Sequence, residues 1–218
     1  MSDTFKITLA QLNPTVGDLN GNADKAFAAW EKSKQSGADL VALPEMFITG
    51  YNAQDLISKS AFHTAAFETI QRLAKACGDG PALAIGGPWK EGNSVFNAYF
   101  ILQSGQIKSV VEKHHLPNDS VFDEVRIFGS GAVGGPYSVG NTRIGSPICE
   151  DAWHEDVVET QVETGAEFLL IPNGSPYHRG KRDTRLNLMV SRVVESGLPL
   201  IYLNMVGGQD DQVFDGGS

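Results

Sequence analysis

Short apolar runs recur along the chain and alternate with longer amphipathic stretches. Several of these runs end beside Gly, Pro or Asn, as buried strands do. The runs predict strands at 5–12, 39–43, 82–86, 95–102, 107–111, 143–149, 167–171 and 198–203. Because Ser104-Gly105-Gln106 separates two of these runs, residues 95–111 are expected to form a β-hairpin.

The amphipathic stretches have the period of a helix. In the first of them Ala23, Ala26, Phe27 and Trp30 recur at i, i+3, i+4 and i+7, the spacing of one helix face. The same period predicts helices at 22–34, 60–77, 154–164 and 182–196. Residues 114–136 show neither period, and we expect them to be irregular.

This alternation predicts the fold class. Strands separated by helices form layered α/β structures, and an antiparallel hairpin makes the sheet mixed. No repeat, low-complexity tract or linker divides the 218 residues, so a single domain spanning 1–218 is expected. A chain of this length buries about 70% of its unfolded surface and needs no disulfide or metal to hold a core.

Composition excludes several classes of function. The chain has 17 Lys and Arg against 26 Asp and Glu, a net charge of −9, which argues against binding to nucleic-acid phosphates. Its apolar runs are too short to span a membrane, and its N-terminal segment lacks the pattern of a signal peptide. We therefore expect a cytoplasmic protein that contacts neither nucleic acid nor membrane.

The two cysteines occupy different kinds of position. Cys77 lies on the apolar stripe of a predicted helix, which is typical of a core thiol. Cys149 ends a predicted strand, and ligands of α/β sheets gather at the carboxyl ends of strands. Cys149 is therefore a candidate nucleophile, with a buried structural thiol as the alternative. The cysteines form no metal-ligand pattern, and no metal is predicted.

A nucleophilic thiol needs a base and a group that stabilises an oxyanion. None of the five histidines stands in a recognisable Cys–His motif. Glu45 and Lys113, however, each follow an apolar run and precede a loop, as Cys149 does. A carboxylate in a cleft can act as general base, and an ammonium group lowers the pKa of a neighbouring thiol. The alternative for either residue is a solvated surface charge.

Three short segments connect these residues to a known family. Leu43-Pro44-Glu45-Met46, the EKHHLPN segment at 112–118 and Ile148-Cys149-Glu150-Asp151 resemble the signature segments of the nitrilase, or carbon–nitrogen hydrolase, superfamily. Three further segments are similar to one branch of it, the N-terminal glutaminase domains of bacterial glutamine-dependent NAD+ synthetases. They are VFDE at 121–124, SPYH at 175–178 and VGGQD at 206–210, and the likeness covers residues 5–218.

The resemblance implies a four-layer αββα sandwich with mixed β-sheets and a Glu–Lys–Cys triad that works without a cofactor. Glu45 would be the general base, Cys149 the nucleophile that forms a γ-glutamyl thioester, and Lys113 the group that stabilises the oxyanion. Glu124 would position Lys113. The substrate would be glutamine, and the ammonia released would serve the amidation of deamido-NAD+ to NAD+.

The resemblance also implies a glutamine pocket that contains Asp119, Phe122, Ser175 and Lys181. Phe122 would wall the pocket, as Tyr51 would, and core packing is the alternative for both rings. Lys181 has an argument of its own, because cations at the start of a helix oppose the helix dipole and so favour a use such as pairing with a carboxylate. Its alternative is a flexible surface lysine.

Two departures from the family bear on function. Asp119 stands where the family usually has tyrosine, so an amidase for a different small amide is an alternative to a glutaminase. The Ser-Gly-Gly-x-Asp-Ser phosphate loop of the ATP-dependent synthetase domain is absent. We therefore expect a piece of a longer protein, truncated at its C-terminal end, whose absent synthetase domain uses ATP and Mg²⁺.

The resemblance further implies a homo-oligomer. A third alternative is a catalytically silent domain kept for assembly or regulation. The presence of Glu45, Lys113 and Cys149 together argues against it, because a silent domain has no need of the triad.

Overall fold

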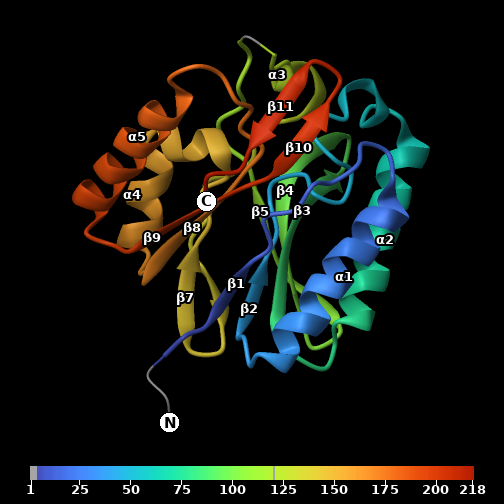
Figure 1. Ribbon diagram of the computed structural model, residues 1–218, viewed down its shortest axis with the longest axis horizontal. Coiled ribbons are helices and arrows are strands. Elements are labelled where there is room, and N and C mark those ends of the chain that lie inside the picture. The colour runs from blue at the N-terminus through green and yellow to red at the C-terminus, as the bar shows by residue number, and fades with distance from the viewer. Residues whose placement is uncertain (1–3, 120) are drawn as a thin grey trace.

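A five-stranded and a four-stranded β-sheet lie at the centre of the computed structural model, which describes residues 4–119 and 121–218 (Figure 1). The larger sheet has the order β1-β2-β3-β4-β5, parallel from β1 to β3 and antiparallel from β3 to β5. Its strands are β1 (Ile7–Leu9), β2 (Leu40–Ala42), β3 (Ala82–Glu91), β4 (Ser94–Gln103) and β5 (Gln106–Glu112). The predicted hairpin is thus confirmed as β4 and β5.

The smaller sheet has the order β6-β7-β8-β9, with an antiparallel β6–β7 pair and parallel pairs beyond it. Its strands are β6 (Tyr137–Val139), β7 (Thr142–Gly145), β8 (Phe168–Asn173) and β9 (Leu200–Asn204). A separate hairpin, β10 (Val206–Gln209) with β11 (Gln212–Asp215), follows β9. The sequence pattern did not predict β6 or this hairpin.

Helices cover the outer face of each sheet (Figure 1). They are α1 (Leu19–Gln35) and α2 (Ser60–Ala76) on the larger sheet and α4 (Glu155–Glu163) and α5 (Lys181–Ser196) on the smaller one. A single-turn helix α3 (Glu124–Ile127) and two 3₁₀ turns, η1 (Gln54–Leu56) and η2 (Cys149–Trp153), complete the elements. Among residues 4–119 and 121–218, no helix combines the length and apolarity that a membrane crossing requires.

Separate apolar clusters fill the spaces between the layers. Trp30 and Ile70 pack with Ile85 and Phe100 between the helices α1 and α2 and the larger sheet. A second cluster lies between the two sheets and joins Leu40, Tyr99 and Ala84 to residues of the smaller sheet, namely Ile144, Leu170 and Leu203. A third places Met189 of α5 against Ile171 and Ala152. This order of layers, helix–sheet–sheet–helix, confirms the predicted αββα class with mixed sheets. The predicted domain span of 1–218 stays a prediction, and residues 1–3 and 120 lie outside the described residues.

Of the element boundaries that differ from the sequence prediction, two lie beside predicted site residues. The strand predicted at 143–149 ends at Gly145, and Cys149 instead begins η2. Pro147 has no N–H for a ladder, and the N–H of Ile148 donates to the side chain of Asp151 at 3.0 Å instead of to a strand. The helix predicted at 182–196 begins at Lys181, because Gly180 caps it with a φ of 82°.

Gly86 allows the turn after β2 to lie directly against β3. A Cβ added to Gly86 would lie 2.1 Å from the backbone nitrogen of Met46 and 2.8 Å from the Cα of Glu45. The backbone N–H of Gly86 donates to Pro44, and that of Ile48 donates to Gly86. Glycine at this position therefore sets where Glu45 enters the interior.

Replacing Gly86 with alanine tests this constraint. Overpacking a core costs about 1–3 kcal/mol, and here the clash is with backbone that cannot rotate away, so Gly86→Ala is expected to lower the free energy of unfolding by at least that much. Gly134→Ala is the control, because nothing lies within 4 Å of its added Cβ. Urea denaturation compares the two variants. Equal midpoints would contradict the close approach.

Candidate active site

Three charged side chains form a cluster in the interior of the protein. Glu45, Lys113 and Glu124 are each 0% exposed. Lys113 Nζ lies 2.7 Å from Glu45 Oε1 and 2.8 Å from Glu124 Oε2. The larger sheet supplies Glu45 after β2 and Lys113 after β5, and α3 supplies Glu124 as its first residue. One ammonium group thus lies between two carboxylates that water does not reach.

Neutral donors complete this cluster. Asn97 Nδ2 donates to Oε1 of Glu45 at 2.8 Å and to Oε1 of Glu124 at 3.2 Å. The Tyr51 hydroxyl donates to Glu124 Oε1 at 2.8 Å, and the backbone N–H of Gly174 donates to Glu45 Oε2 at 2.7 Å. Both oxygens of Glu45 therefore accept hydrogen bonds, which fix the orientation of its carboxylate.

The pKa values of the cluster reflect opposing effects of burial and charge. Burial alone would lower the pKa of Lys113, but the charges of Glu124 and Glu45 raise it well above its ordinary value. Burial raises the pKa of Glu124, and the neighbouring Lys113 ammonium opposes that rise. Lys113 therefore keeps its proton and acts as a fixed positive charge.

Cys149 lies beside this cluster at a sharp turn of the backbone. Its φ of 47° is in the left-handed region that non-glycine residues rarely adopt, and it starts η2 directly after an extended Ile148. Its side chain is buried, and its thiol experiences the charges of Glu45, Lys113 and Glu124. A strained turn that presents a nucleophile at the end of a sheet is a known arrangement in hydrolases.

Burial and the charges of this cluster together set the pKa of the Cys149 thiol. Burial raises it well above its ordinary value, Glu45 raises it further, and Lys113 offsets only part of the rise. The expected lowering of the thiol pKa by Lys113 is present, but burial and Glu45 outweigh it. The thiol is protonated at neutral pH and needs a base to ionise it.

Asp151 connects the Cys149 turn to the segment that carries Lys113. Its Oδ1 accepts the backbone N–H groups of His114 at 3.0 Å and His115 at 2.7 Å. Its Oδ2 accepts the N–H of Ile148 at 3.0 Å. One buried carboxylate thus fixes the residues next to Lys113 and Cys149 relative to each other. Burial raises the pKa of Asp151, and these backbone hydrogen bonds oppose the rise.

The arrangement of a carboxylate, an ammonium group and a thiol has a match among known families. The family described as carbon–nitrogen hydrolase matches residues 6–218. The chain belongs to the carbon–nitrogen hydrolase family.

Several relatives of this chain have a name that is more specific than that of the family. The glutamine-dependent NAD(+) synthetase of Rhodobacter capsulatus is 56% identical over the whole of this chain. A solved structure of glutamine-dependent NAD+ synthetase from Acinetobacter baumannii, in complex with ADP, superposes with a TM-score of 0.89 at 30% identity over 97% of this chain. The chain spans 40% of the length of each of these two proteins.

A solved amidase of the nitrilase superfamily from Nesterenkonia AN1 has the same fold. It superposes with a TM-score of 0.84 at 24% identity, and the match covers 97% of this chain and 80% of that one. The family match over residues 6–218 confirms the predicted superfamily. The catalytic roles of Glu45, Lys113 and Cys149 stay predictions.

The predicted substrate-binding residues come from separate segments of the chain. Phe122 is half-buried and its ring centroid is 6.1 Å from that of Tyr51, which itself contacts Glu124. Lys181 starts α5, with Nζ 4.7 Å from the centroid of the Trp153 ring at the end of η2. Asp119 is exposed, and its carbonyl accepts the N–H of Phe122 at 3.0 Å.

Ser175 is buried and held by an arginine that sequence reasoning missed. Arg185 Nε donates to Ser175 Oγ at 3.1 Å, and its Nη2 donates to the carbonyls of Ser175 and Pro176. Its Nη1 pairs with Asp215 Oδ1 at 2.8 Å. Arg185 therefore ties β11 to the loop after β8 and fixes the hydroxyl of Ser175.

Asn97 and Asp151 were also missed. A signal for Asn97 exists, because it is a polar residue inside the otherwise apolar run 95–102. Asp151 follows Cys149 by two residues, and from the sequence alone a charged residue there is expected to be solvated. In the structure it is 1% exposed, so only the tertiary structure shows that this carboxylate is buried.

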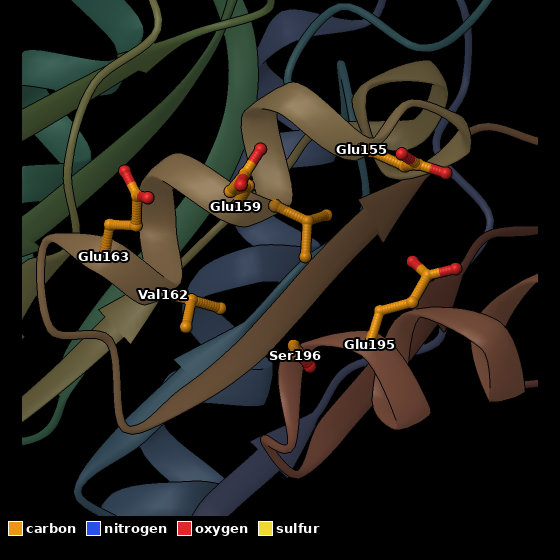
Figure 2. A pocket seen from close by; sticks show the side chains of 7 residues that line it. Glu155, Glu159, Val162, Glu163, Glu195 and Ser196 are labelled. Carbon is orange, nitrogen blue, oxygen red and sulfur yellow. The ribbon is translucent and has the colours of Figure 1, made fainter.

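A surface groove between α4 and α5 lies apart from this cluster (Figure 2). Glu159 and Glu163 of α4 and Glu195 of α5 line it, together with Val158 and Val162. Among the described residues that line it, none belongs to the predicted site. The buried cluster, and not this groove, holds the groups that amide hydrolysis needs.

The pH dependence of thiol alkylation tests the charge environment of Cys149. Glu45→Gln removes a negative charge that raises the pKa of the Cys149 thiol, and Lys113 keeps its positive charge. The pH profile of Cys149 alkylation is therefore expected to shift to lower pH. Peptide mass spectrometry separates Cys149 from Cys77, whose pKa burial raises to about 12. Glu31→Gln is the control, because Glu31 acts on Cys77. An unchanged or upward-shifted Cys149 profile in Glu45→Gln would contradict the assignment.

Replacing Asp151 with asparagine tests the link between the two segments. The amide nitrogen would face the N–H of Ile148 or those of His114 and His115, which leaves at least one buried donor without an acceptor. Such a loss costs about 1–3 kcal/mol, so Asp151→Asn is expected to lower the free energy of unfolding by that amount in urea denaturation. Asp24→Asn, at an exposed position of α1, is the control. Equal stability of both variants would refute the role of Asp151.

Proposed function

We propose that this chain is a glutaminase domain, which hydrolyses the side-chain amide of glutamine and supplies ammonia for the amidation of deamido-NAD+. The observation that carries the proposal is the buried pair of Glu45 and Lys113, 2.7 Å apart, whose charges both act on the thiol of Cys149. A base, a fixed cation and a nucleophile are the three groups that amide hydrolysis through a thioester needs.

The first half of the reaction acylates the enzyme. Glu45 takes the proton of the Cys149 thiol, and the thiolate attacks the amide carbon of glutamine. Lys113 stabilises the negative oxygen of the tetrahedral intermediate, together with a backbone N–H near Glu150. Glu45 returns the proton to the departing nitrogen, ammonia leaves, and a γ-glutamyl thioester remains.

The second half releases glutamate. Glu45 takes a proton from water, whose oxygen attacks the thioester carbon, and Lys113 again stabilises the oxyanion. The C–S bond breaks and the sulfur regains its proton. The raised pKa of Cys149 supports this assignment of Glu45, because a thiol that is protonated at neutral pH requires a base in both halves.

Glu124 has a separate task in this proposal. Its Oε2 lies 2.8 Å from Lys113 Nζ, so it holds the ammonium group in place and helps keep it charged. Asn97 and the Tyr51 hydroxyl occupy its other oxygen, which fixes the carboxylate. Glu124 is therefore a positioning residue, which acts on the reaction through Lys113.

The predicted binding residues would bind the α-amino and α-carboxylate ends of glutamine. Lys181 would pair with the α-carboxylate, and its position over Trp153, the last residue of the turn that Cys149 begins, supports a site near the thiol. Ser175 would donate its hydroxyl, which Arg185 orients. Asp119 would accept the α-ammonium group, and Phe122 would wall the pocket.

The wider role belongs to a longer protein. The names of the relatives, together with the 40% share of their length that the chain spans, support a synthetase domain in the same polypeptide. We extend the proposal to a cytoplasmic homo-oligomer in which ATP and Mg²⁺ serve that synthetase domain and the glutaminase step uses no cofactor.

Replacing Cys149 with alanine tests the proposal in the intact protein. Cys149→Ala is expected to reduce glutamine-dependent NAD+ formation by more than about 10³-fold, because the nucleophile is lost, and to leave ammonia-dependent formation intact. Cys77→Ala, a core thiol, is the control and should keep both activities. A glutamine-mimicking diazo-ketone should add one adduct, at Cys149, as mass spectrometry would detect.

Other outcomes favour the alternatives. A clear preference for a different small amide over glutamine would replace the glutaminase with another amidase, and Asp119 is the residue that motivates this test. Equal glutamine-dependent and ammonia-dependent activities in Cys149→Ala would favour a silent assembly domain.

A further inference from the structure

A second cluster of ionisable side chains lies at the surface beside the active-site cluster. A ring nitrogen of His114, a ring nitrogen of His115 and a carboxylate oxygen of Asp156 lie within 4.8 Å of one another. His115 Nε2 already lies 2.8 Å from Oδ1 and 3.0 Å from Oδ2 of Asp156. The mechanism proposed above uses none of these side chains.

The His114 ring is oriented in a way that leaves one nitrogen free to bind a metal ion. Its Nδ1 lies 2.7 Å from the carbonyl oxygen of Gly131. A carbonyl only accepts, so Nδ1 carries the proton and the neutral ring has its lone pair on Nε2. Metal-binding histidines almost always donate their other N–H to a carboxylate, a carbonyl or water, which is the arrangement at His114.

Gly131 is held where its carbonyl can make this contact. A Cβ at position 131 would lie 2.3 Å from the Cβ of Glu112, so only glycine fits without a shift. The N–H of Gly131 donates to the carbonyl of Lys113 at 2.8 Å. The partner of the His114 ring is therefore fixed to the backbone of the same segment.

The other two side chains are also held in place. The rings of His114 and His115 meet edge to face with centroids 4.7 Å apart, and the His115 ring stacks on that of His154 at 3.8 Å. Asp156 lies in the first turn of α4, where its Oδ1 accepts the N–H of Val157 at 2.8 Å. Its side chain is 57% exposed, so an ion can reach it from solvent.

We propose that His114, His115 and Asp156 bind a Zn²⁺ ion. Two imidazole nitrogens and one carboxylate suit Zn²⁺, whereas Mg²⁺ and Ca²⁺ prefer sites made of oxygen. Ligand atoms around tetrahedral zinc lie about 3.3 Å apart, given bonds of about 2.0–2.1 Å, so small side-chain rotations bring the three atoms onto one ion. Water would take the fourth position.

The ion would stabilise the segment next to Lys113. The backbone N–H groups of His114 and His115 are already bound to Asp151, and a zinc ion on their rings would tie the same two residues to the start of α4. The site is thus structural, and it is independent of the glutaminase proposal.

Zinc binding to the intact protein tests the site, with Cys149→Ala as the background so that the active-site thiol cannot bind the ion. Isothermal titration should show a Zn²⁺ site that Asp156→Asn and His115→Ala each weaken by more than about 10- to 100-fold, since loss of even an outer partner costs that much. His178→Ala is the control, because His178 is exposed and its Nδ1 contacts the carbonyl of Arg179. Excess Mg²⁺ or Ca²⁺ should not compete.

Two further measurements separate a built site from loss of folding. Zn²⁺ should raise the Tm of the background protein and not that of Asp156→Asn. The side chain of Asp156 is exposed, so the substitution should leave the protein folded, and circular dichroism checks this. Co²⁺ bound to the background protein should show visible d–d absorption, which Asp156→Asn removes. Zinc affinity that is undetectable, or equal in the background and in both variants, would overturn the proposal, and neither result would affect the test of glutamine hydrolysis.

Discussion

The buried contact of Lys113 with Glu45 and Glu124 is the interaction on which the rest of the structure depends. Taking an ion out of water costs several kcal/mol, and the attraction of its partners offsets that cost only if the geometry is good and the remaining donors and acceptors are satisfied. Here the three charged side chains come from loops after two strands of the larger sheet and from α3, and the backbone N–H of Gly174 after β8 donates to Glu45. The charge cluster therefore requires that both sheets be stacked in one register.

Close backbone approaches make that stacking possible. Gly86 lets the Glu45 turn lie against β3, and Gly174 lies so near Tyr51 that an added Cβ would be 2.6 Å from the ring. Asp151 then uses one carboxylate to hold the Lys113 segment and the Cys149 turn together. Backbone N–H donors and steric limits thus fix the site together with the charge contacts, and groups held in this way favour preorganised electrostatics.

The same segment serves two kinds of chemistry in our proposals. Lys113 points into the charge cluster, and the next two residues, His114 and His115, present their rings to Asp156 at the surface. Their backbone N–H groups bind Asp151 in between. A change at the surface cluster would therefore reach Lys113 through its peptide bond to His114. It would reach the segment before Cys149 through the hydrogen bonds of Asp151, which gives a zinc ion a physical route to stabilise the site without entering the reaction.

Local pattern was sufficient for the fold class and for the identity of the central residues. Alternating strands and helices predicted the α/β layers, and Glu45, Lys113 and Cys149 stood out because each is a reactive residue after an apolar run. The short signature segments then predicted the family. Only the tertiary structure decided the end of β7 at Gly145, the β10–β11 hairpin, the roles of Asn97 and Asp151, and the raised thiol pKa. The reason is distance along the chain: Tyr51 and Glu124 are 73 residues apart and Glu45 and Gly174 are 129 apart, and no local periodicity records such contacts or the exclusion of water around them.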